Sequence, residues 1–391
     1  MISQMDNVLL ALDDEQPFLD IIQRVAKSAD FTAVTTTDPA AFKAALLTNP
    51  PTVILLDLQM PNCDGVEILH VLAEAQSRAK IILLSGFEAR VLGLARGIGQ
   101  GLGLDMGEPM PKPLRPADLQ QVLASLRRST INITAIGLKE ALDQYYLDLF
   151  YQPIMSLGTN ETIGFEGLVR WRHPEYGIVP PDLFIGLAER EDLIDRVTDR
   201  VLEVAAKQIS SWRTQGIDTF VSVNLSVHNI VADLPDRLVR LCTRHNIHPE
   251  YLRLELTETA AMTNHALMLE VLTRVRLKGF MLAIDDFGTG YSSLVQLHRL
   301  PFSELKIDQS FVREMGTSAE ANLIIGAIIN LGRSMQMDLI AEGIETADQK
   351  ERLAGMGCET GQGFLFSKPI PAVDVPSWLA KREINAGASP P

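Results

Sequence analysis

The sequence predicts two α/β domains in succession, a doubly wound parallel sheet and then a TIM-like barrel. Short, continuous runs of Val, Ile and Leu recur along the chain, and such runs are typical of parallel strands buried on both faces. Stretches of helical length separate them, which is the pattern of repeated βα units. With 391 residues, the chain is long enough for two or three domains.

The first domain is predicted over residues 1–128. Its strand candidates are the apolar runs NVLLAL, TVILLDL and KIILLS. EQPFLDIIQRVAKSA and DPAAFKAALLTN are helix-like stretches between them. PADLQQVLASLRRS is expected to be the last helix, because Pro116 near its start and basic residues at its end suit the two ends of a helix. The alternation predicts a doubly wound sheet.

A linker and a leading helix are predicted over residues 129–140, and the second domain over residues 141–385. GLKEALDQYYLDLF is expected to be one helix that runs into this domain. The strand candidates that follow are FVSVNL, LRLEL, GFMLAIDDF, ELKID, MDLIAEG and GQGFLF. Helical stretches such as ALMLEVLTRVRLKG and NLIIGAIINLGRSMQ separate several of them, which indicates a TIM-like barrel. Residues 386–391 are predicted to be a disordered tail.

Composition narrows the classes of function. A net charge of -14 argues against a nucleic-acid partner bound through a broad basic face. No apolar run has the length of a membrane span, so no membrane partner is expected. The three cysteines, Cys63, Cys242 and Cys358, are scattered, which is typical of reduced thiols in a cytoplasmic protein. The N-terminus MISQMDN lacks the charged and apolar regions of a signal peptide.

Polar side chains recur where the strands of the second domain end. Barrel enzymes build their sites at that rim. The residues are Glu166, Asn224, Glu255, Glu258, Asp285, Asp286, Lys306, Glu342, Glu345 and Gln362. Hard oxygen ligands without His or Cys favour Mg²⁺ or Mn²⁺, and several acids around a shared carboxylate are typical of two-metal hydrolysis of phosphate esters. Each residue alone is more simply explained as a cap, a turn residue or an ion-pair partner, but that explanation is weak for the whole set.

The second domain resembles an EAL domain, the phosphodiesterase of cyclic di-GMP. The motifs that carry the resemblance are YQPI, GFEGLVRW, VNLS, LELTET, IDDFGTGYSSL, LKID, AEGIET and GQGFLFSKP, in the family's order. The resemblance implies a (β/α)8 barrel with one antiparallel strand, which holds two Mg²⁺ (or Mn²⁺) ions. One ion would be held by Glu166, Asn224, Glu255 and Asp285, and the second by Asp285, Asp286 and Glu342.

The resemblance also assigns further roles. Lys306 would position the attacking water. Substrate contacts would come from Gln152, Leu168, Arg170, Asn224 and Gln362. Glu345 and Glu258 would anchor the DFGTGYSSL loop, which the family associates with metal binding and with a dimer interface. The implied reaction is in-line hydrolysis of cyclic di-GMP to linear pGpG.

The namesake triplet departs from the family, because it reads EGL with Gly167 in place of alanine. Strand alternation predicts that Gly167 faces away from the metals, so we expect a small structural cost and no loss of chemistry. Two alternatives stay open. One is a receptor that binds cyclic di-GMP without cleaving it, and the other is a scaffold that acts through its first domain.

Polar residues also follow the strands of the first domain. Asp13 and Asp14 end the first strand, Asp57 ends TVILLD, Ser85 ends KIILLS and Lys112 lies in MPKPL. In a doubly wound sheet these strand ends share one edge, and three acids there suit one Mg²⁺.

Together these residues resemble a response-regulator receiver domain. The resemblance implies the CheY-like, flavodoxin-like fold, a doubly wound parallel sheet of five strands. The resemblance makes Asp57 the phosphoacceptor, gives Asp13 and Asp14 to one Mg²⁺, and places Ser85 and Lys112 on the phosphoryl group. It departs at Pro109, where an aromatic switch residue is usual. The stretch ARGIGQGLGLDMG is also rich in glycine, and interior glycines weaken a helix, so we expect an irregular region there.

The sequence thus predicts a two-component response regulator whose phosphodiesterase is tuned by phosphorylation of Asp57. A histidine kinase or phosphorelay protein is the expected donor. A homo-oligomer, dimer or tetramer, is expected through the EAL domains. The sequence does not predict the sign of the phosphorylation effect.

Overall fold

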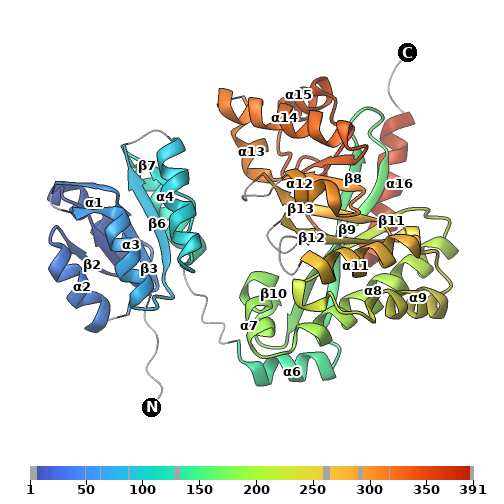
Figure 1. Ribbon diagram of the computed structural model, residues 1–391, viewed down its shortest axis with the longest axis horizontal. Helices are drawn as coiled ribbons and strands as arrows, with labels where there is room; N and C mark the ends of the chain where they lie inside the picture. Colours follow the sequence, from blue (N-terminus) through green and yellow to red (C-terminus); the bar gives the residue numbers. More distant parts are fainter. Residues whose placement is uncertain are drawn as a thin grey trace. The chain divides into compact units, whose positions relative to one another are not determined.

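The computed structural model describes residues 7–48, 50–61, 63–86, 89–126, 133–258, 265–288, 294–316 and 318–387. Its contacts divide the chain into two compact units, residues 1–132 and residues 133–391. The first unit is a parallel α/β sheet and the second is a closed α/β barrel (Figure 1), so the predicted fold class is confirmed.

The first unit is a five-stranded parallel sheet in the order β2-β1-β3-β6-β7. Its elements are β1 (Val8–Leu12), α1 (Gln16–Ser28), β2 (Thr32–Thr36), α2 (Pro39–Thr48), β3 (Val53–Asp57), the short pair β4 (Gln59–Met60) and β5 (Cys63–Asp64), α3 (Gly65–Glu74), β6 (Lys80–Ser85), α4 (Ala89–Gly101), β7 (Met110–Pro111) and α5 (Pro116–Leu126). Every residue of β1 and β3 is buried, as expected for strands covered on both faces.

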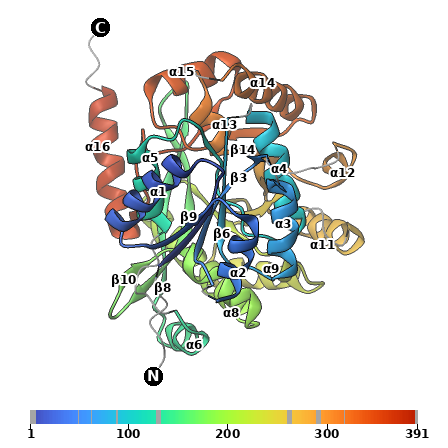
Figure 2. The same ribbon diagram turned by 90° about the vertical axis from the view of Figure 1, so that its left-hand side faces the viewer.

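Helices cover both faces of this sheet (Figure 2). α1 and α5 pack on one face through a cluster that includes Leu19, Ile22, Leu119 and Leu123. α2, α3 and α4 pack on the other face through a second cluster. Because β1 and β3 are neighbours, their carboxyl ends lie side by side at one edge of the sheet, which is where ligands bind in such folds.

The glycine-rich helix is more regular than predicted, because α4 runs without a break from residue 89 to Gly101. Its buried residues Leu92 and Ala95 join the core of that face. A β-carbon at Gly99 would lie 2.4 Å from the sulfur of Met106, so this glycine makes room for the segment that follows. Tertiary packing therefore outweighs the low helix propensity. The irregular part is confined to the residues between α4 and β7.

The second unit is an eight-stranded barrel, with its strands in the order β9-β11-β12-β13-β14-β15-β16-β8, closed by the pairing of β8 with β9. The barrel strands are β8 (Leu147–Ser156), β9 (Thr162–His173), β11 (Phe220–Asn224), β12 (Leu252–Thr257), β13 (Leu282–Phe287), β14 (Glu304–Ile307), β15 (Asp338–Ala341) and β16 (Thr360–Gly361). β8 runs antiparallel to both of its neighbours, β9 and β16, as the family resemblance implies.

Helices and short strands surround this barrel (Figure 1). They are α6 (Ala135–Asp143), β10 (Gly177–Val179), η1 (Pro181–Leu183), α7 (Ile185–Arg190), α8 (Ile194–Thr214), η2 (Val227–Asn229), α9 (Leu234–His245), η3 (Pro249–Tyr251), α11 (His265–Leu277), α12 (Leu294–Arg299), α13 (Gln309–Glu314), α14 (Ala319–Ser334), α15 (Ala347–Met356), β17 (Ile370–Pro371), η4 (Ala372–Asp374) and α16 (Val375–Gly387). In the described residues, no helix is both long and apolar enough to cross a membrane.

Two predicted elements are wrong in part. The helix expected through GLKEALDQYYLDLF ends at Asp143, and the chain turns at Tyr145, which has a left-handed φ of 59°, before β8 begins. The strand expected at GQGFLF is reduced to Thr360–Gly361. Directly after these two residues the backbone packs against Ile344, because a β-carbon at Gly363 would lie 2.2 Å from the Ile344 backbone. The Ile344 N–H donates to the Gln362 carbonyl at 3.0 Å, and the Leu365 N–H donates to the Ile344 carbonyl at 2.9 Å. At the C-terminus, α16 continues to Gly387, past the predicted start of the tail.

One end of the barrel is closed by side chains. The ring of Phe220 packs so closely on Gly164 that a β-carbon there would lie 2.3 Å from it. The guanidinium of Arg253 stacks on the same ring at 3.4 Å and also pairs with the buried Glu304. Phe220 and Arg253 are at the starts of their strands. The opposite rim, at the carboxyl ends of the parallel strands, is where the predicted site residues gather.

Candidate metal and active sites

The register of the barrel strands aligns the predicted site residues of the second unit. Asn224 lies opposite Glu255, and Thr257 lies opposite Asp285. Seven strands contribute to the set: Glu166 from β9, Asn224 from β11, Glu255 from β12, Asp285 and Asp286 from β13, Lys306 from β14, Glu342 directly after β15 and Gln362 directly after β16.

Lys306 lies in the middle of these residues, and its side chain is fully buried. Its ammonium nitrogen lies 2.7 Å from Glu255 Oε2, 2.7 Å from Glu342 Oε1, 3.1 Å from Asp285 Oδ1 and 3.6 Å from Glu166 Oε2. Burial alone lowers the pKa of Lys306, but these four carboxylates raise it well above its ordinary value. Among these carboxylates the lysine is therefore an internal cation.

Two side-chain amides hold the carboxylates in place. Asn224 Nδ2 donates to Glu166 Oε1 at 3.0 Å. Gln362 Nε2 donates to Glu166 Oε2 at 2.6 Å and to Glu342 Oε1 at 2.8 Å. The Gln362 Oε1 atom is buried and accepts no hydrogen bond from the described residues. It is therefore an acceptor that a bound ligand or water can satisfy.

The acids form two groups that share one residue. Carboxylate oxygens of Glu166, Glu255 and Asp285 lie within 4.8 Å of one another, and so do those of Asp285, Asp286 and Glu342. When the five carboxylates of these two groups are all ionised, they and the one ammonium of Lys306 carry four net negative charges, which equals in size the charge of two divalent ions. Burial and the neighbouring carboxylates raise the pKa of Glu255 despite the opposing effect of Lys306, and its Oε1 is buried without a hydrogen-bond partner among the described residues. This donor set fits hard cations.

Asp308 is a site residue that the sequence analysis missed. It directly follows β14, is buried, and caps α13 by accepting the backbone N–H of Ser310 at 2.9 Å. Burial, Asp285 and Asp308 raise the pKa of Asp286 to about 7, and a hydrogen bond between the two carboxyl groups contributes. Asp286 also has an unusual left-handed φ of 54°. The signal was available, because Asp308 ends the strand motif LKID, as the other acids end theirs.

The predicted substrate contacts lie around the same rim. Gln152 pairs with Glu166 in the β8–β9 ladder, and its Nε2 donates to the Ser367 carbonyl at 3.3 Å. Arg170 is four residues beyond Glu166 on β9, and its guanidinium donates to the Val169 carbonyl at 2.9 Å. Their contact with a substrate stays a prediction.

The loop after Asp286 is held by Glu258. The backbone N–H of Gly288 donates to Glu258 Oε2 at 2.9 Å, and the Glu258 side chain is buried. Glu345, the other predicted anchor, is exposed and directly precedes the N-cap residue of α15. Its backbone N–H donates to Gln349 Oε1 at 2.8 Å. Residues 289–293 of the DFGTGYSSL loop lie outside the described residues, so its predicted role stays a prediction.

Gly167 sits on the outer face of β9. A β-carbon there would lie 3.2 Å from Leu149 Cδ1, 3.2 Å from Val221 Cγ1 and 3.3 Å from the Ser222 carbonyl. The two nearest contacts are flexible side chains, so alanine requires only a small local adjustment. Glu166, one position earlier, reaches the opposite face, where Lys306 lies.

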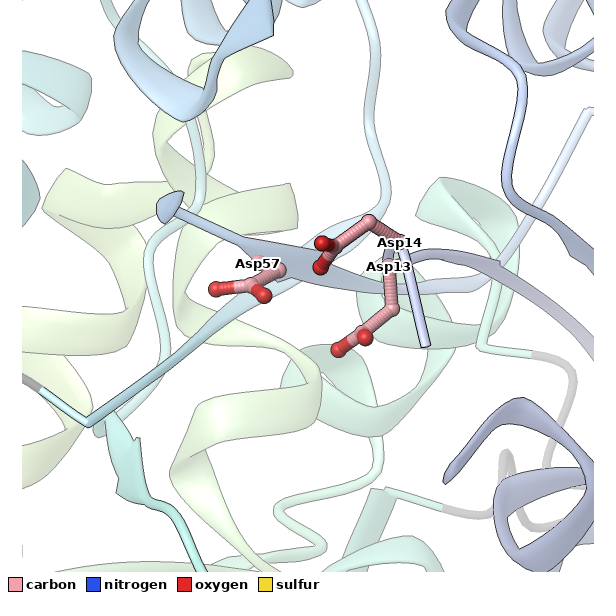
Figure 3. A group of neighbouring side chains, drawn as sticks. All are labelled: Asp13, Asp14 and Asp57. Atoms are coloured by element: carbon pink, nitrogen blue, oxygen red, sulfur yellow. The ribbon is translucent and has the colours of Figure 1, made fainter. Parts of the chain in front are cut away.

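The acids of the first unit form a second candidate metal site. Asp13 and Asp14 follow β1 and Asp57 ends β3, and Figure 3 shows the three side chains grouped at these strand ends. One carboxylate oxygen of each lies within 4.8 Å of the others. Asp13 and Asp57 are buried and Asp14 is exposed. Ser85 is the last residue of β6, the neighbour of β3.

Lys112 joins two of these acids. Its ammonium lies 2.7 Å from Asp13 Oδ2 and 2.6 Å from Asp57 Oδ2. Burial raises the pKa of Asp13 and would lower that of Lys112, but the ion pairs oppose both effects, so the pKa of Lys112 is raised. Three carboxylates against one ammonium leave two negative charges, which equals the charge of one divalent ion.

Comparisons with known proteins agree with this division of the chain. A family model described as the EAL domain matches residues 137–369, and one described as the response regulator receiver domain matches residues 9–124. The bifunctional diguanylate cyclase/cyclic di-GMP phosphodiesterase MucR of Pseudomonas aeruginosa is 41% identical over 237 residues, which is 60% of this chain and 35% of MucR. The cyclic di-GMP phosphodiesterase NbdA of the same organism is 40% identical over 256 residues, 65% of this chain and 32% of NbdA.

A solved structure described as the PaMucR phosphodiesterase in complex with c-di-GMP has a TM-score of 0.59 and 40% identity, and the match covers 61% of this chain and 98% of that one. The chain spans about a third of the length of the two curated relatives. The EAL model matches more than half of the 391 residues. The protein therefore belongs to the EAL domain family and carries a receiver domain ahead of its EAL domain.

Proposed function

We propose that this protein hydrolyses cyclic di-GMP to linear pGpG. The observation that carries the proposal is the pair of acid groups that share Asp285 around the buried Lys306. The charge count supports two divalent ions, Mg²⁺ or Mn²⁺, held by Glu166, Asn224, Glu255 and Asp285 and by Asp285, Asp286 and Glu342. When bound, such ions stabilise charge on phosphate oxygens and lower the pKa of water.

The chain's own residues would orient the substrate and the attacking water. Lys306 donates to the carboxylates on either side of Asp285, so it fixes the acids and keeps a positive charge beside the phosphate. Gln362 offers its free acceptor oxygen to the attacking water or to the substrate. Arg170, whose pKa burial lowers, would pair with a phosphate oxygen of the dinucleotide.

A cavity of about 480 Å³ between β9, α7 and α8 supports a nucleotide substrate. Its lining includes Leu168, Val169, Ile185, Val197 and Leu225, and it reaches the metal-ligand candidate Asn224. An apolar cavity of this size beside the carboxylates suits the flat ring of a nucleobase.

The test is incubation of the purified full chain with cyclic di-GMP and Mg²⁺, followed by chromatography and mass analysis. We expect linear pGpG, and we expect Glu166→Gln to bind substrate but lose more than about a hundredfold in rate, because a metal ligand is lost. Intact substrate after long incubation with folded protein would reject hydrolysis. Binding without turnover would instead favour the receptor alternative.

We also propose that phosphorylation of Asp57 by a histidine kinase or phosphorelay protein tunes this activity. Asp57 is supported as the acceptor by its place among Asp13, Asp14 and Lys112 at the sheet edge, with one Mg²⁺ held there. Turnover measured with and without beryllofluoride gives the size and sign of the effect, and no difference would reject the link. Light scattering tests the proposed homo-oligomer. The buried free thiols Cys242 and Cys358 support the proposed cytoplasmic setting.

A further inference from the structure

The ammonium of Lys112 has an aromatic neighbour in addition to its two carboxylates. It lies 4.8 Å from the centre of the ring of Phe18, within the range of a cation–π contact. Phe18 is in the first turn of α1, the helix that begins just after Asp13 and Asp14. Only 19% of the Lys112 side chain is exposed, so the contact is partly shielded from water and is stronger than at an open surface.

The ring differs from the other two partners in what happens to it during phosphorylation. Asp13 is a candidate metal ligand, and Asp57 gains a phosphoryl group, so both carboxylates must change their contacts with the lysine. A hydrocarbon ring binds neither a metal nor phosphate. Of the three contacts to Lys112 described here, the one with Phe18 is therefore the one that can persist while the ammonium moves from Asp13 to the phosphoryl oxygens.

We infer that Phe18 is a positioning residue for Lys112, and that it serves as the aromatic group of this receiver, where Pro109 occupies the usual aromatic position. The inference rests on the proposed phosphorylation of Asp57. The ring keeps the ammonium over the acid edge, so that it meets the incoming phosphoryl group with little loss of entropy.

Phe18 also connects the lysine to the interior of the first unit. Its ring packs against the cluster that contains Leu19 of α1 and Leu119 and Leu123 of α5. A displacement of Lys112 together with the Phe18 ring would thus change the packing between α1 and α5. α5 ends at Leu126, directly before the residues that lead into the EAL domain.

The step to be measured is transfer from a small phosphoramidate. A carboxylate oxygen of Asp57 attacks phosphorus and the O–P bond forms. The P–N bond breaks, and the nitrogen, which is already protonated as –NH3⁺ in phosphoramidate, leaves as neutral ammonia. The Lys112 ammonium meets the phosphoryl oxygens and keeps its own protons. The full chain is incubated with Mg²⁺ and phosphoramidate, and labelling is followed by intact-mass spectrometry, with Asp57→Asn as the blank.

Three substitutions isolate the ring. Phe18→Leu keeps an apolar side chain but removes the π face, and we expect labelling to slow about 3- to 10-fold. Phe18→Trp keeps the π face and should label at the wild-type rate or faster. Phe31→Leu removes a ring from the same cluster and should leave the rate unchanged. Circular dichroism and urea unfolding check that each variant is folded.

The outcomes separate the inference from the function on which it rests. Wild-type labelling with equal labelling of Phe18→Leu overturns the role of the ring, and so does equal slowing in Phe31→Leu. If Phe18→Leu does not fold, slow labelling of folded Phe18→Trp overturns the inference. Absence of wild-type labelling at Asp57 rejects the phosphorylation proposal itself, and the inference with it.

Discussion

The two acid sites of this chain are built from the same parts in different proportions. Each is a set of carboxylates at the carboxyl ends of parallel strands, with one lysine among them. In the barrel, the lysine has four carboxylate neighbours and no exposed surface. In the receiver, it has two, and 19% of its side chain is exposed.

The difference suits the function proposed for each site. The barrel encloses its lysine on all sides, so the acids would keep fixed positions around the proposed substrate and ions. The receiver leaves its lysine partly exposed, so this lysine could exchange one partner for another in the proposed phosphorylation of Asp57. After pairing with its lysine, the barrel site keeps four negative charges and the receiver site keeps two, when all the acids are ionised. A buried cation suits a site that is preorganised, and a partly exposed cation suits a site that switches.

Removal of each lysine tests this comparison most strongly. We expect Lys306→Met to lower the free energy of unfolding of the EAL domain by about 3–5 kcal/mol in chelator, because buried carboxylates lose their cation. Lys112→Met should cost the receiver about 1–2 kcal/mol, because fewer and more exposed groups are affected. Urea unfolding followed by circular dichroism measures both. Equal losses of unfolding free energy in the two variants would contradict the difference proposed between the two sites.

The pH dependence of the stability of the metal-free barrel tests how closely the carboxylates of its site are packed. Asp286 has a pKa of about 7 in the folded protein, against an ordinary 3.8, so the folded state keeps a proton that the unfolded state has lost. The stability from this group is complete below about pH 4 and is lost as pH rises through 7. Asp286→Asn should flatten the profile in chelator by about 1–3 kcal/mol after solvent screening.

Mg²⁺ should act in the opposite direction to the proton. Because the metal competes with protons for the same carboxylates, its stabilising effect should grow between pH 5 and pH 8. A melting temperature measured across this range with Mg²⁺ and with chelator gives both curves. A chelator profile of Asp286→Asn that matches the wild type would contradict the assignment of the raised pKa.

Glu258 tests whether the order of the barrel site depends on its loop. Glu258→Ala removes the acceptor for the Gly288 N–H, and the lost hydrogen bond of about 1–2 kcal/mol predicts hydrolysis about 5- to 30-fold slower. Glu258→Gln keeps an acceptor and should retain most of the rate. Labelling of Asp57 is the internal control and should not change. A slower label in Glu258→Ala would mean that the variant is damaged more widely.

Gly167→Ala gives the smallest expected effect. The added methyl meets two movable side chains at 3.2 Å, and alanine also lowers the entropy of the unfolded chain. We expect a change in unfolding free energy below about 1 kcal/mol and a hydrolysis rate within about twofold of the wild type. A larger loss of rate would show that the outer face of β9 affects the acids on its inner face.

Most of the fold was predictable because its strands are continuous apolar runs. TVILLD and KIILLS became β3 and β6, and a strand buried on both faces leaves that pattern in any sequence. GLKEALDQYYLDLF was harder, because its second half is the reversed strand β8, which is needed to close the barrel. Closure is a property of the whole sheet and leaves no local signal near Tyr145.

The candidate site followed the same logic. Acids at strand ends were predicted because the carboxyl ends of parallel strands meet at one rim. Asp308 was missed although it obeys that rule, because its capping of α13 is a sufficient local explanation for an acid after a strand. The hydrogen bond from the Gly288 N–H to Glu258 depends on how the segments after β12 and β13 pack together. The spacing of the two residues in the sequence does not predict it.

The buried Lys306 has a consequence for how the protein matures. Because the chain carries its own counter-ion, the barrel can close around the acids before the proposed metal ions bind, so folding and metal loading would be separate events. The extent of loading would then depend on the supply of free divalent ion and not on when the chain folded. If the proposed hydrolysis needs these ions, its rate would also depend on the concentration of free divalent ion around the protein.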